Sequence, residues 1–418
     1  MQNFLYILLA LAVLLVLITV HEFGHFIAGK IFGFKINEFA IGFGPKLYSR
    51  TNKTTGEVFS VRALPLGGFC AFEGEDEENP SKDAFNNKAP WKRIIVLVSG
   101  VLFNFIFGIL TAAIFLMVNG YGVAKITDFS PNNDNANLLM KNDVIVAVDG
   151  KSIEAYRSMS DLLKKYKVGD EITLTVEREG EKVEISGVKK IRTEAFYFSS
   201  NIENAEGKVF DETGKVLSKD ELYDFIKSIK PVYNEETQKY QDFAIGKTLY
   251  KNSDKTEAYT DQEFATLTNI VLSGPADSVG FIYYNMQARY GFFESLLKAW
   301  PFCFYICGLI FSALGGLFTG ATALSEVGGT FTAIGQIAEI SKMGFSSFLL
   351  LLPMLAMNLA IFNILPIPAL DGARCVFVLI EWIFKKPVPR KVENIIHTVG
   401  LFVLLGLVLF LDIYHFFL

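Results

Sequence analysis

Cysteine is scarce in this sequence, and basic residues do not gather into a tract. The four cysteines show neither CxxC spacing nor the density of a disulfide scaffold, so we expect buried or lipid-facing thiols. Lysine and arginine are spread along a chain whose formal net charge is -5, which gives no indication of nucleic-acid binding. Histidine is equally scarce, with four residues, so a closely spaced pair of histidines is informative.

Long apolar runs dominate the composition instead. Hydrophobic residues make up 51% of the chain and aromatic residues 14%, which is too apolar for an ordinary soluble enzyme and predicts an integral membrane protein. We expect four membrane spans, at residues 4–28, 94–118, 345–384 and 395–418. The third is interrupted by Pro353, Pro366 and Pro368. The first has no basic start and no cleavage site, so we expect it to be retained as a helix.

Positive charges in the short loops predict how these spans are oriented. Six lysines and arginines between residues 30 and 62, and four between 385 and 391, mark both segments as cytoplasmic. An even number of crossings must then separate the two segments. The uncharged stretch 301–323 is also long enough to cross, but a crossing there would make the number odd. We therefore predict that 301–323 is interfacial or half-inserted.

The segment LITVHEFGHFIAGK, residues 17–30, places three polar side chains behind the first apolar run. Residues four apart share one face of a helix, so His21 and His25 can present two imidazoles to one metal ion while Glu22 lies beside them as a base. A helix that enters the membrane near Phe4 and rises ~1.5 Å per residue reaches His21 after ~25 Å. This HExxH spacing predicts a zinc hydrolase site inside the membrane, near its cytoplasmic side. Two histidines hydrogen-bonded within a helix bundle are the alternative.

A catalytic zinc ion needs a third protein ligand and an open position. Asp371 is the candidate, within NLAIFNILPIPALDGARC at residues 358–375. Pro366 and Pro368 break the helix before it, which allows the Asp371 carboxylate to turn toward the metal. Two alternatives stay open: Asp371 could cap the following half-helix, and Cys375 is a weaker ligand candidate.

These two motifs resemble those of the site-two protease family of intramembrane zinc metalloproteases, most closely its bacterial, sigma-factor-regulating (RseP-like) branch. Further similar segments are IGFGPKL at 41–47, LPLGGF at 64–69, AFNNK at 84–88, and Gly100 with Asn104. The resemblance covers residues 1–118 and 345–418.

The resemblance implies the roles of individual residues and a class of substrate. Zn2+ would be bound by His21, His25 and Asp371, with Glu22 as the catalytic base. Substrate backbone would be contacted by Asn358 and Asn363. Apart from the resemblance, the helix break frees carbonyls at Pro366 and Pro368, which we expect to bond an extended substrate strand. The substrate would be a single-span membrane protein, such as an anti-sigma factor already cut on its outer side by a site-one protease, or a residual signal peptide.

The segments between the spans predict two further parts. FKINEFAIGF and VFSVRAL alternate apolar and polar residues, so we expect strands in the cytoplasmic loop. In the family such a sheet dips into the membrane and offers an edge to an extended substrate, while plain surface structure is the alternative. Residues 121–192 resemble a PDZ domain, which would either bind an extended terminus or exclude bulky proteins. Residues 193–298 match no known pattern.

We therefore expect a polytopic α-helical membrane protein with about four transmembrane helices, a cytoplasmic membrane-associated β-hairpin and an extracytoplasmic α/β PDZ-like domain. Its expected parts are 1–118 with the HExxH helix, 119–192 as the PDZ-like domain, 193–298 as an insertion, 299–344 as the interfacial segment, and 345–418 with the LDG motif. The bacterial cytoplasmic membrane would be its location, and the lipid bilayer and a single-span protein its partners.

A metal transporter and a non-catalytic PDZ scaffold are the alternative functions. A transporter would need further carboxylates or histidines along a path through the membrane, and the spans show little beyond this one cluster. A scaffold would not need Glu22 beside the two histidines. Both alternatives are therefore disfavoured by the sequence.

Overall fold

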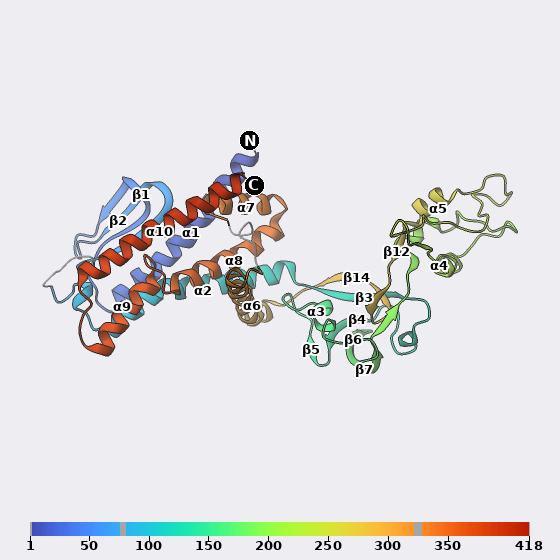
Figure 1. The fold of residues 1–418 in the computed structure, drawn as a ribbon, viewed down its shortest axis with the longest axis horizontal. Coiled ribbons are helices and arrows are strands. Elements are labelled where there is room, and N and C mark those ends of the chain that lie inside the picture. The colour runs from blue at the N-terminus through green and yellow to red at the C-terminus, as the bar shows by residue number, and fades with distance from the viewer. Residues whose placement is uncertain (1, 76–80, 322–327, 418) are drawn as a thin grey trace. The chain divides into compact units, whose positions relative to one another are not determined.

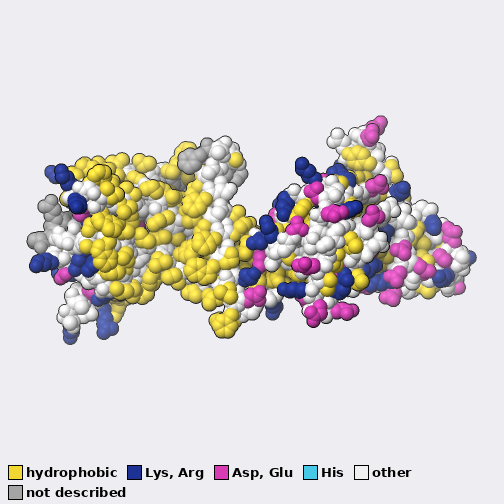
Figure 2. Space-filling model, turned by 90° about the horizontal axis from the view of Figure 1, so that it is seen from below, with side chains coloured by type: hydrophobic (Ala, Val, Ile, Leu, Met, Phe, Trp, Pro, Cys, Tyr) yellow, Lys and Arg dark blue, Asp and Glu magenta, His cyan; other side chains and the backbone are white. Residues whose placement is uncertain are grey.

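The computed structural model describes residues 2–75, 81–321 and 328–417, so residues 322–327 of the expected interfacial segment lie outside the description. The chain divides into two compact units, which are Met1–Gly120 with Arg289–Leu418, and Tyr121–Ala288 (Figure 1). Figure 2 shows hydrophobic side chains over most of the visible surface of the first unit, and acidic and basic side chains over the second.

The first unit is built from long apolar helices. They are α1 (Gln2–Ile31), α2 (Pro90–Asn119), α6 (Phe292–Thr319), α7 (Thr330–Lys342), α8 (Phe345–Ile364), α9 (Asp371–Phe384) and α10 (Arg390–Phe417). Within the described residues, five of these helices, α1, α2, α6, α8 and α10, contain segments long and apolar enough to cross a membrane. The chain is thus a multi-pass membrane protein with a β-rich part.

Helices α1 and α2 lie unusually close together beside the HExxH motif. A Cβ atom added at Gly24 of α1 would lie 2.4 Å from the carbonyl oxygen of Ser99 in α2. Only a residue without a side chain permits this approach, as in other closely packed membrane helices. Gly24 therefore brings α2 against the histidine face of α1.

Residues 345–384, which were expected to form the third membrane span, form two helices. Pro353 lies inside α8 and does not interrupt it, contrary to the sequence-based expectation. The carbonyl that such a proline frees is tolerated in a membrane helix when neighbouring groups or local adjustments satisfy it. The break comes at the other two prolines, where α8 ends at Ile364 and α9 begins at Asp371.

Helix α6 contains most of the stretch 301–323 and runs across α2. Phe105 of α2 contacts Trp300 and Phe304, whereas Phe115, ten residues further along α2, contacts Phe302 on the opposite face of α6. A helix that touches so long a part of α2 within one of its own turns cannot run parallel to it, and Figure 1 shows α6 nearly end-on beside the lengthwise α2. The length and composition of α6 permit a crossing, so the interfacial or half-inserted placement of 301–323 stays a prediction.

A small sheet covers the end of α1. Its strands are β1 (Ile36–Thr51) and β2 (Val58–Phe72), and each contributes two segments. Residues 36–41 pair with 72–68, residues 38–41 also pair with 58–61, and residues 46–51 pair with 62–58. The segments at 46–51 and 68–72 therefore each have one outer edge. The segment at 68–72 is the one that lies next to Glu22, as described below.

The second unit contains a six-stranded sheet in the order β14-β3-β4-β6-β7, with β5 (Lys151–Ser152) paired to β4. The other strands are β3 (Tyr121–Phe129), β4 (Val144–Val148), β6 (Glu171–Arg178), β7 (Glu181–Lys189) and β14 (Phe281–Ala288). The sequence placed the end of this domain at residue 192, but its outer strand β14 lies 89 residues further along. Alternation alone did not reveal this strand, because its pairing with β3 is non-local.

The chain between β7 and β14 forms a small core of its own. Its elements are β8 (Ile191–Thr193), β9 (Phe196–Ser199), α4 (Lys219–Ser228), β10 (Tyr233–Asn234), β11 (Lys239–Tyr240), α5 (Asp261–Thr268), β12 (Ile270–Ser273) and β13 (Ala276–Ser278). Helices α4 and α5 both begin with a reciprocal capping box, at Ser218 and Thr260. Leu222, Ile226 and Phe264 are fully buried between them.

Candidate metal centre

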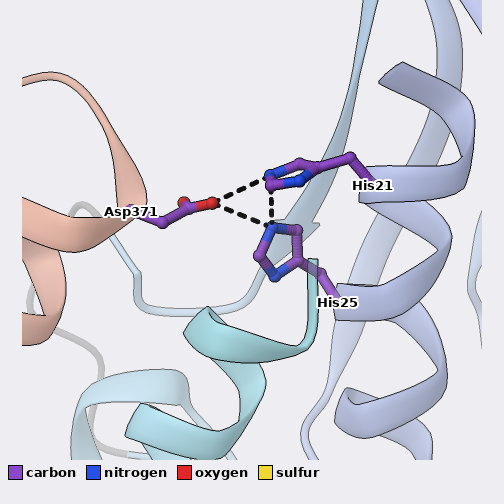
Figure 3. Close-up of side chains that lie close together, drawn as sticks. All are labelled: His21, His25 and Asp371. Atoms are coloured by element: carbon purple, nitrogen blue, oxygen red, sulfur yellow. Dashed lines mark hydrogen bonds and ion pairs between the residues drawn. The ribbon is translucent and has the colours of Figure 1, made fainter. Parts of the chain in front are cut away.

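Three side chains from two distant parts of the chain meet beside α2. His21 and His25 lie on one face of α1, and Asp371 is the first residue of α9 (Figure 3). His21 Nε2 is 2.9 Å from Asp371 Oδ2 and 3.1 Å from His25 Nε2, and His25 Nε2 is 3.3 Å from the same carboxylate oxygen. Among the described residues, these three form the group of donors close enough to hold one metal ion.

The geometry of this cluster fits zinc. Zinc bonds to histidine nitrogen and carboxylate oxygen are ~2.0–2.2 Å long, so two donors in a tetrahedral shell lie ~3.3 Å apart. The three separations in the cluster, from 2.9 to 3.3 Å, are close to this value. Three protein donors leave one position of the tetrahedron for water or substrate, as in a catalytic site.

Each histidine is oriented by a hydrogen bond from its other ring nitrogen. His25 Nδ1 lies 2.8 Å from the carbonyl oxygen of Val96, to which only a protonated Nδ1 can donate. The lone pair of His25 is then on Nε2, which faces the other donors. A carbonyl partner of this kind is the usual support of a metal-binding histidine.

Asn104 of α2 lies behind His21 as the Val96 carbonyl lies behind His25. Its amide nitrogen lies 3.1 Å from His21 Nδ1, and its Oδ1 is buried without a hydrogen-bond partner among the described residues. A half-turn of the amide exchanges the two atoms, so that Oδ1 accepts the Nδ1 proton and leaves the His21 Nε2 lone pair for the metal. Asn104 is fully buried, which keeps its amide close to the ring.

Gly100 provides the space that the two imidazoles occupy. A Cβ atom at this position would lie 2.5 Å from His25 Nε2 and 2.7 Å from His21 Cε1. Gly100 and Asn104 are one helical turn apart and therefore share the face of α2 that is turned to α1. The sequence pointed to this pair through the family resemblance but gave it no role.

Asp371 is turned to the histidines and not to its own helix. The residue in the capping position of α9 is Leu370, and its side chain makes no capping hydrogen bond. Gly372 allows the start of α9 to lie directly against the end of α8, since a Cβ there would be 2.3 Å from the carbonyl oxygen of Ile364. Cys375 is buried in an apolar cluster with Val378 and is not part of the donor group.

Glu22 is half-buried between the donors and the sheet. A Cβ atom at Gly68 of β2 would lie 3.6 Å from Glu22 Cγ, and the backbone of Cys70 hydrogen-bonds to the Glu22 carboxylate. Glu22 thus lies between the three donors and the outer segment of β2.

The remaining residues named from the sequence lie near the broken helix but do not join the cluster. Asn358 is exposed and Asn363 is half-buried, and within the described chain neither hydrogen-bonds to the three donors. Pro366 is exposed, while Pro368 contacts α10 at Gly400. His397 of α10, which the sequence did not single out, binds the backbone of Ala369 in this same loop.

Comparison with known proteins agrees with this geometry. The model of peptidase family M50 matches residues 9–407 of the chain. A protein of Pasteurella multocida, whose name gives it as a candidate zinc metalloprotease, is 30% identical over 96% of both chains. The regulator of sigma E protease of Haemophilus influenzae is 28% identical over 94% of this chain and 95% of its own. A similarly named candidate metalloprotease of Fusobacterium nucleatum is 28% identical over 97% of both chains.

Proposed function

The chain belongs to peptidase family M50 and is a zinc metalloprotease, and from this premise we propose that it hydrolyses a peptide bond within or near the transmembrane segment of a single-span protein. The observation that carries the proposal is the meeting of His21, His25 and Asp371 among membrane helices, with Glu22 beside them. A membrane protein that controls a sigma factor is a fitting substrate, since one relative is named regulator of sigma E protease.

In the proposed mechanism, His21, His25 and Asp371 hold the zinc ion and Glu22 moves the proton. When bound, zinc supplies a Lewis acid that lowers the pKa of water toward ~7 and polarises a carbonyl group. The Glu22 carboxylate accepts the proton of the attacking water and then returns it to the nitrogen of the leaving amine. The Val96 carbonyl and Asn104 keep both imidazoles oriented so that their Nε2 atoms would face the ion.

We propose that the substrate binds as an extended strand along the outer edge of residues 68–72. A peptide bond within a helix is enclosed by backbone hydrogen bonds, so the transmembrane segment must unwind before it can be cut. An added β-strand would satisfy the backbone groups that unwinding exposes. The edge beside Glu22 offers such pairing close to the base, and Asn363, with the carbonyls freed by Pro366 and Pro368, could bind the far side of the strand.

The proposed location is the bacterial cytoplasmic membrane, with the metal site near its cytoplasmic side. The lysines and arginines around the sheet and between α9 and α10 support this orientation. The unit Tyr121–Ala288 would then lie outside the cell membrane, as a PDZ-like domain that either binds an exposed terminus or excludes folded proteins. Its outer strand β14 is an edge to which a terminus could add.

The test is proteolysis of a panel of single-span peptides by the purified full-length protein with zinc, comparing wild type with Glu22→Gln. We expect the variant to retain nearly stoichiometric zinc and to lose cleavage by several orders of magnitude, because it keeps the ligands and loses the base. Glu294→Gln, at the start of α6, is the matched control and should cleave normally. Retained cleavage in Glu22→Gln would contradict the role of Glu22, and lost zinc would make it a ligand.

A further inference from the structure

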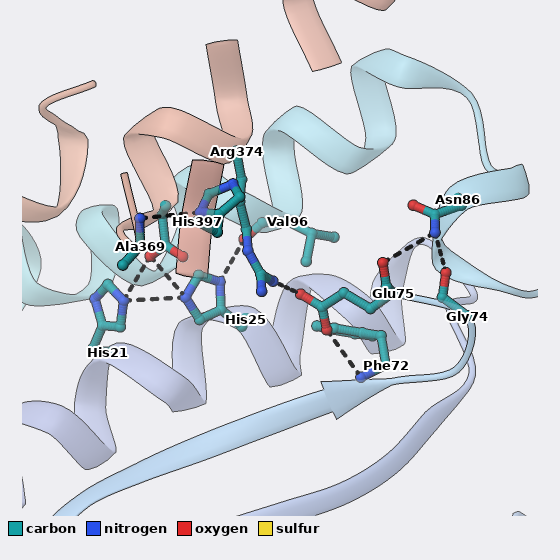
Figure 4. A network of polar contacts seen from close by, with 11 residues as sticks. His21, His25, Phe72, Gly74, Glu75, Asn86, Val96, Ala369, Arg374 and His397 are labelled. Carbon is teal, nitrogen blue, oxygen red and sulfur yellow. Dashed lines mark hydrogen bonds and ion pairs between the residues drawn. The ribbon is translucent and has the colours of Figure 1, made fainter. Parts of the chain in front are cut away.

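The loop between α8 and α9 is held from outside by α10. The backbone N–H of Ala369 donates a hydrogen bond of 3.0 Å to Nδ1 of His397 (Figure 4). Ala369 has a φ of +77°, a left-handed conformation that is unfavourable for a residue with a Cβ atom. Such a conformation persists only where the surroundings fix it, and such residues cluster at functional sites. The metal-site residue Asp371 follows two positions later.

A second contact of α10 fixes the same loop. A Cβ atom at Gly400, one turn after His397, would lie 2.1 Å from Pro368 Cβ, so α10 and the loop are in direct contact there. Elsewhere α10 is largely exposed, as at Val399 and Phe402, whose exposed fractions are 56% and 69%. This exposed surface is interrupted at Pro368 and Ala369, and again near the end of α10, where the Asp412 carboxylate accepts the N–H groups of Phe331 and Thr332 in α7.

We propose that His397 is a positioning residue for the metal centre: by accepting the N–H of Ala369 it fixes the turn that carries Asp371 to the two histidines. The proposal rests on the proposed function, since it takes Asp371 as a zinc ligand. Pro368 has no N–H, and among the described residues the N–H of Ala369 donates to no backbone carbonyl, so this donor needs a side-chain acceptor from another element. His397 Nδ1 supplies it.

The start of α9 is fixed on its other side by a different contact. Arg374, one turn after Asp371, forms an ion pair with Glu75, and a second oxygen of Glu75 accepts the N–H of Phe72 in β2 (Figure 4). Asp371 is thus placed between a contact with α10 and a contact with the sheet. A polar cavity of about 270 Å³ adjoins both contacts and is lined by Arg374, Glu75 and His397 among others.

The acceptor and the ring of His397 can be tested separately. His397→Phe retains a ring against Phe377, whose centroid lies 5.5 Å from that of His397, but removes the acceptor. His397→Asn loses the ring but places a side-chain oxygen close to where Nδ1 lies. Zinc affinity of the purified full-length protein, measured by competition with a chromophoric chelator, and the absorption spectrum of the Co2+-loaded protein report on the ligands without any substrate.

We expect His397→Phe to weaken zinc binding by about 10–100-fold and to change the Co2+ spectrum in the direction of Asp371→Asn, as loss of an outer partner does at other metal sites. His397→Asn should stay within about threefold of wild type. Gly400→Ala provides a second perturbation of the loop that leaves His397 in place, and it should produce the same spectral change. Cleavage should show a lower kcat with little change in KM.

The results separate this proposal from the one on which it rests. If Asp371→Asn binds zinc as tightly as wild type, then Asp371 is not a ligand and the proposed site is wrong. If Asp371→Asn loses zinc but His397→Phe keeps the affinity and spectrum of wild type, the positioning role of His397 is wrong. An equal loss in His397→Asn and His397→Phe would also overturn it, because an acceptor at this position would then not preserve the metal centre.

Discussion

Replacing Gly100 by alanine should damage the metal centre without unfolding the helices around it. The added methyl carbon would lie 2.5 Å from His25 Nε2, whereas nonbonded heavy atoms normally stay ~3.5 Å apart. An imidazole or α2 itself must therefore move by ~1 Å. A workable zinc site tolerates only ~0.2 Å in its bond lengths. The displaced atom is a proposed metal donor, so the strain falls on coordination.

The size of the effect follows from these distances. Overpacking of this kind costs ~1–3 kcal/mol, but alanine favours the helix by ~1 kcal/mol over glycine, so the net loss of stability should be small. A misplacement of ~1 Å in a catalytic group can lower activity by ~100-fold. We therefore expect Gly100→Ala to fold, to bind zinc at least ~10-fold more weakly and to cleave peptides ~100-fold more slowly.

Gly108 supplies the control on the same helix. A Cβ atom there would lie 2.1 Å from the terminal methyl of Met357, which is the end of a flexible side chain and can turn away. Gly108→Ala should therefore retain wild-type zinc affinity and cleavage. Zinc titration and peptide cleavage of both variants decide the matter. Normal zinc binding by Gly100→Ala, or an equal loss in Gly108→Ala, would refute the steric reasoning.

Three further predictions follow from the same structure. Asn104→Ala should weaken zinc binding by ~10–100-fold and Asn104→Asp by much less, because aspartate still accepts the His21 proton; equal losses in a chelator competition would contradict this. Asn363→Ala should slow cleavage of helix-stable, leucine-rich spans more than that of spans with glycine or proline, at unchanged zinc content; an equal slowing of both would exclude a role in unwinding. Cysteines placed at Asp211 should be labelled from outside intact cells and those at Lys386 should not, whereas labelling at Lys386 would show that α6 crosses.

Much of the proposed site is predictable from the sequence because its chemistry is local. The spacing of His21, Glu22 and His25 is sufficient to place all three on one helix, and the prolines before Asp371 indicate the break that turns it inward. The groups that orient these residues come from other helices, so they depend on tertiary contacts that the sequence does not show. The carbonyl of Val96 belongs to an ordinary apolar helix, and His397 lies 28 residues from the backbone group that it binds.

The fold shows the same division between local and distant information. Apolar runs predict the membrane helices, since length and hydropathy are properties of each segment. Pro353 was misjudged because one proline is tolerated in a membrane helix whose neighbours compensate. Strand β14 was not recognised as part of the sheet, because its partner β3 lies more than 150 residues earlier and pairing across such a distance leaves no local pattern.

The pairing of β3 with β14 also bears on how such a chain could have been assembled. Tyr121 and Ala288, the first and last residues of the second unit, are direct partners in adjacent antiparallel strands. The two ends of this unit therefore lie about 5 Å apart, a gap that a few residues could close. Segments with adjoining ends can be inserted into a host or removed from it without stretching the host chain. The second unit is in this sense a cassette, exchangeable between α2 and α6 while the helices that carry the metal ligands stay intact.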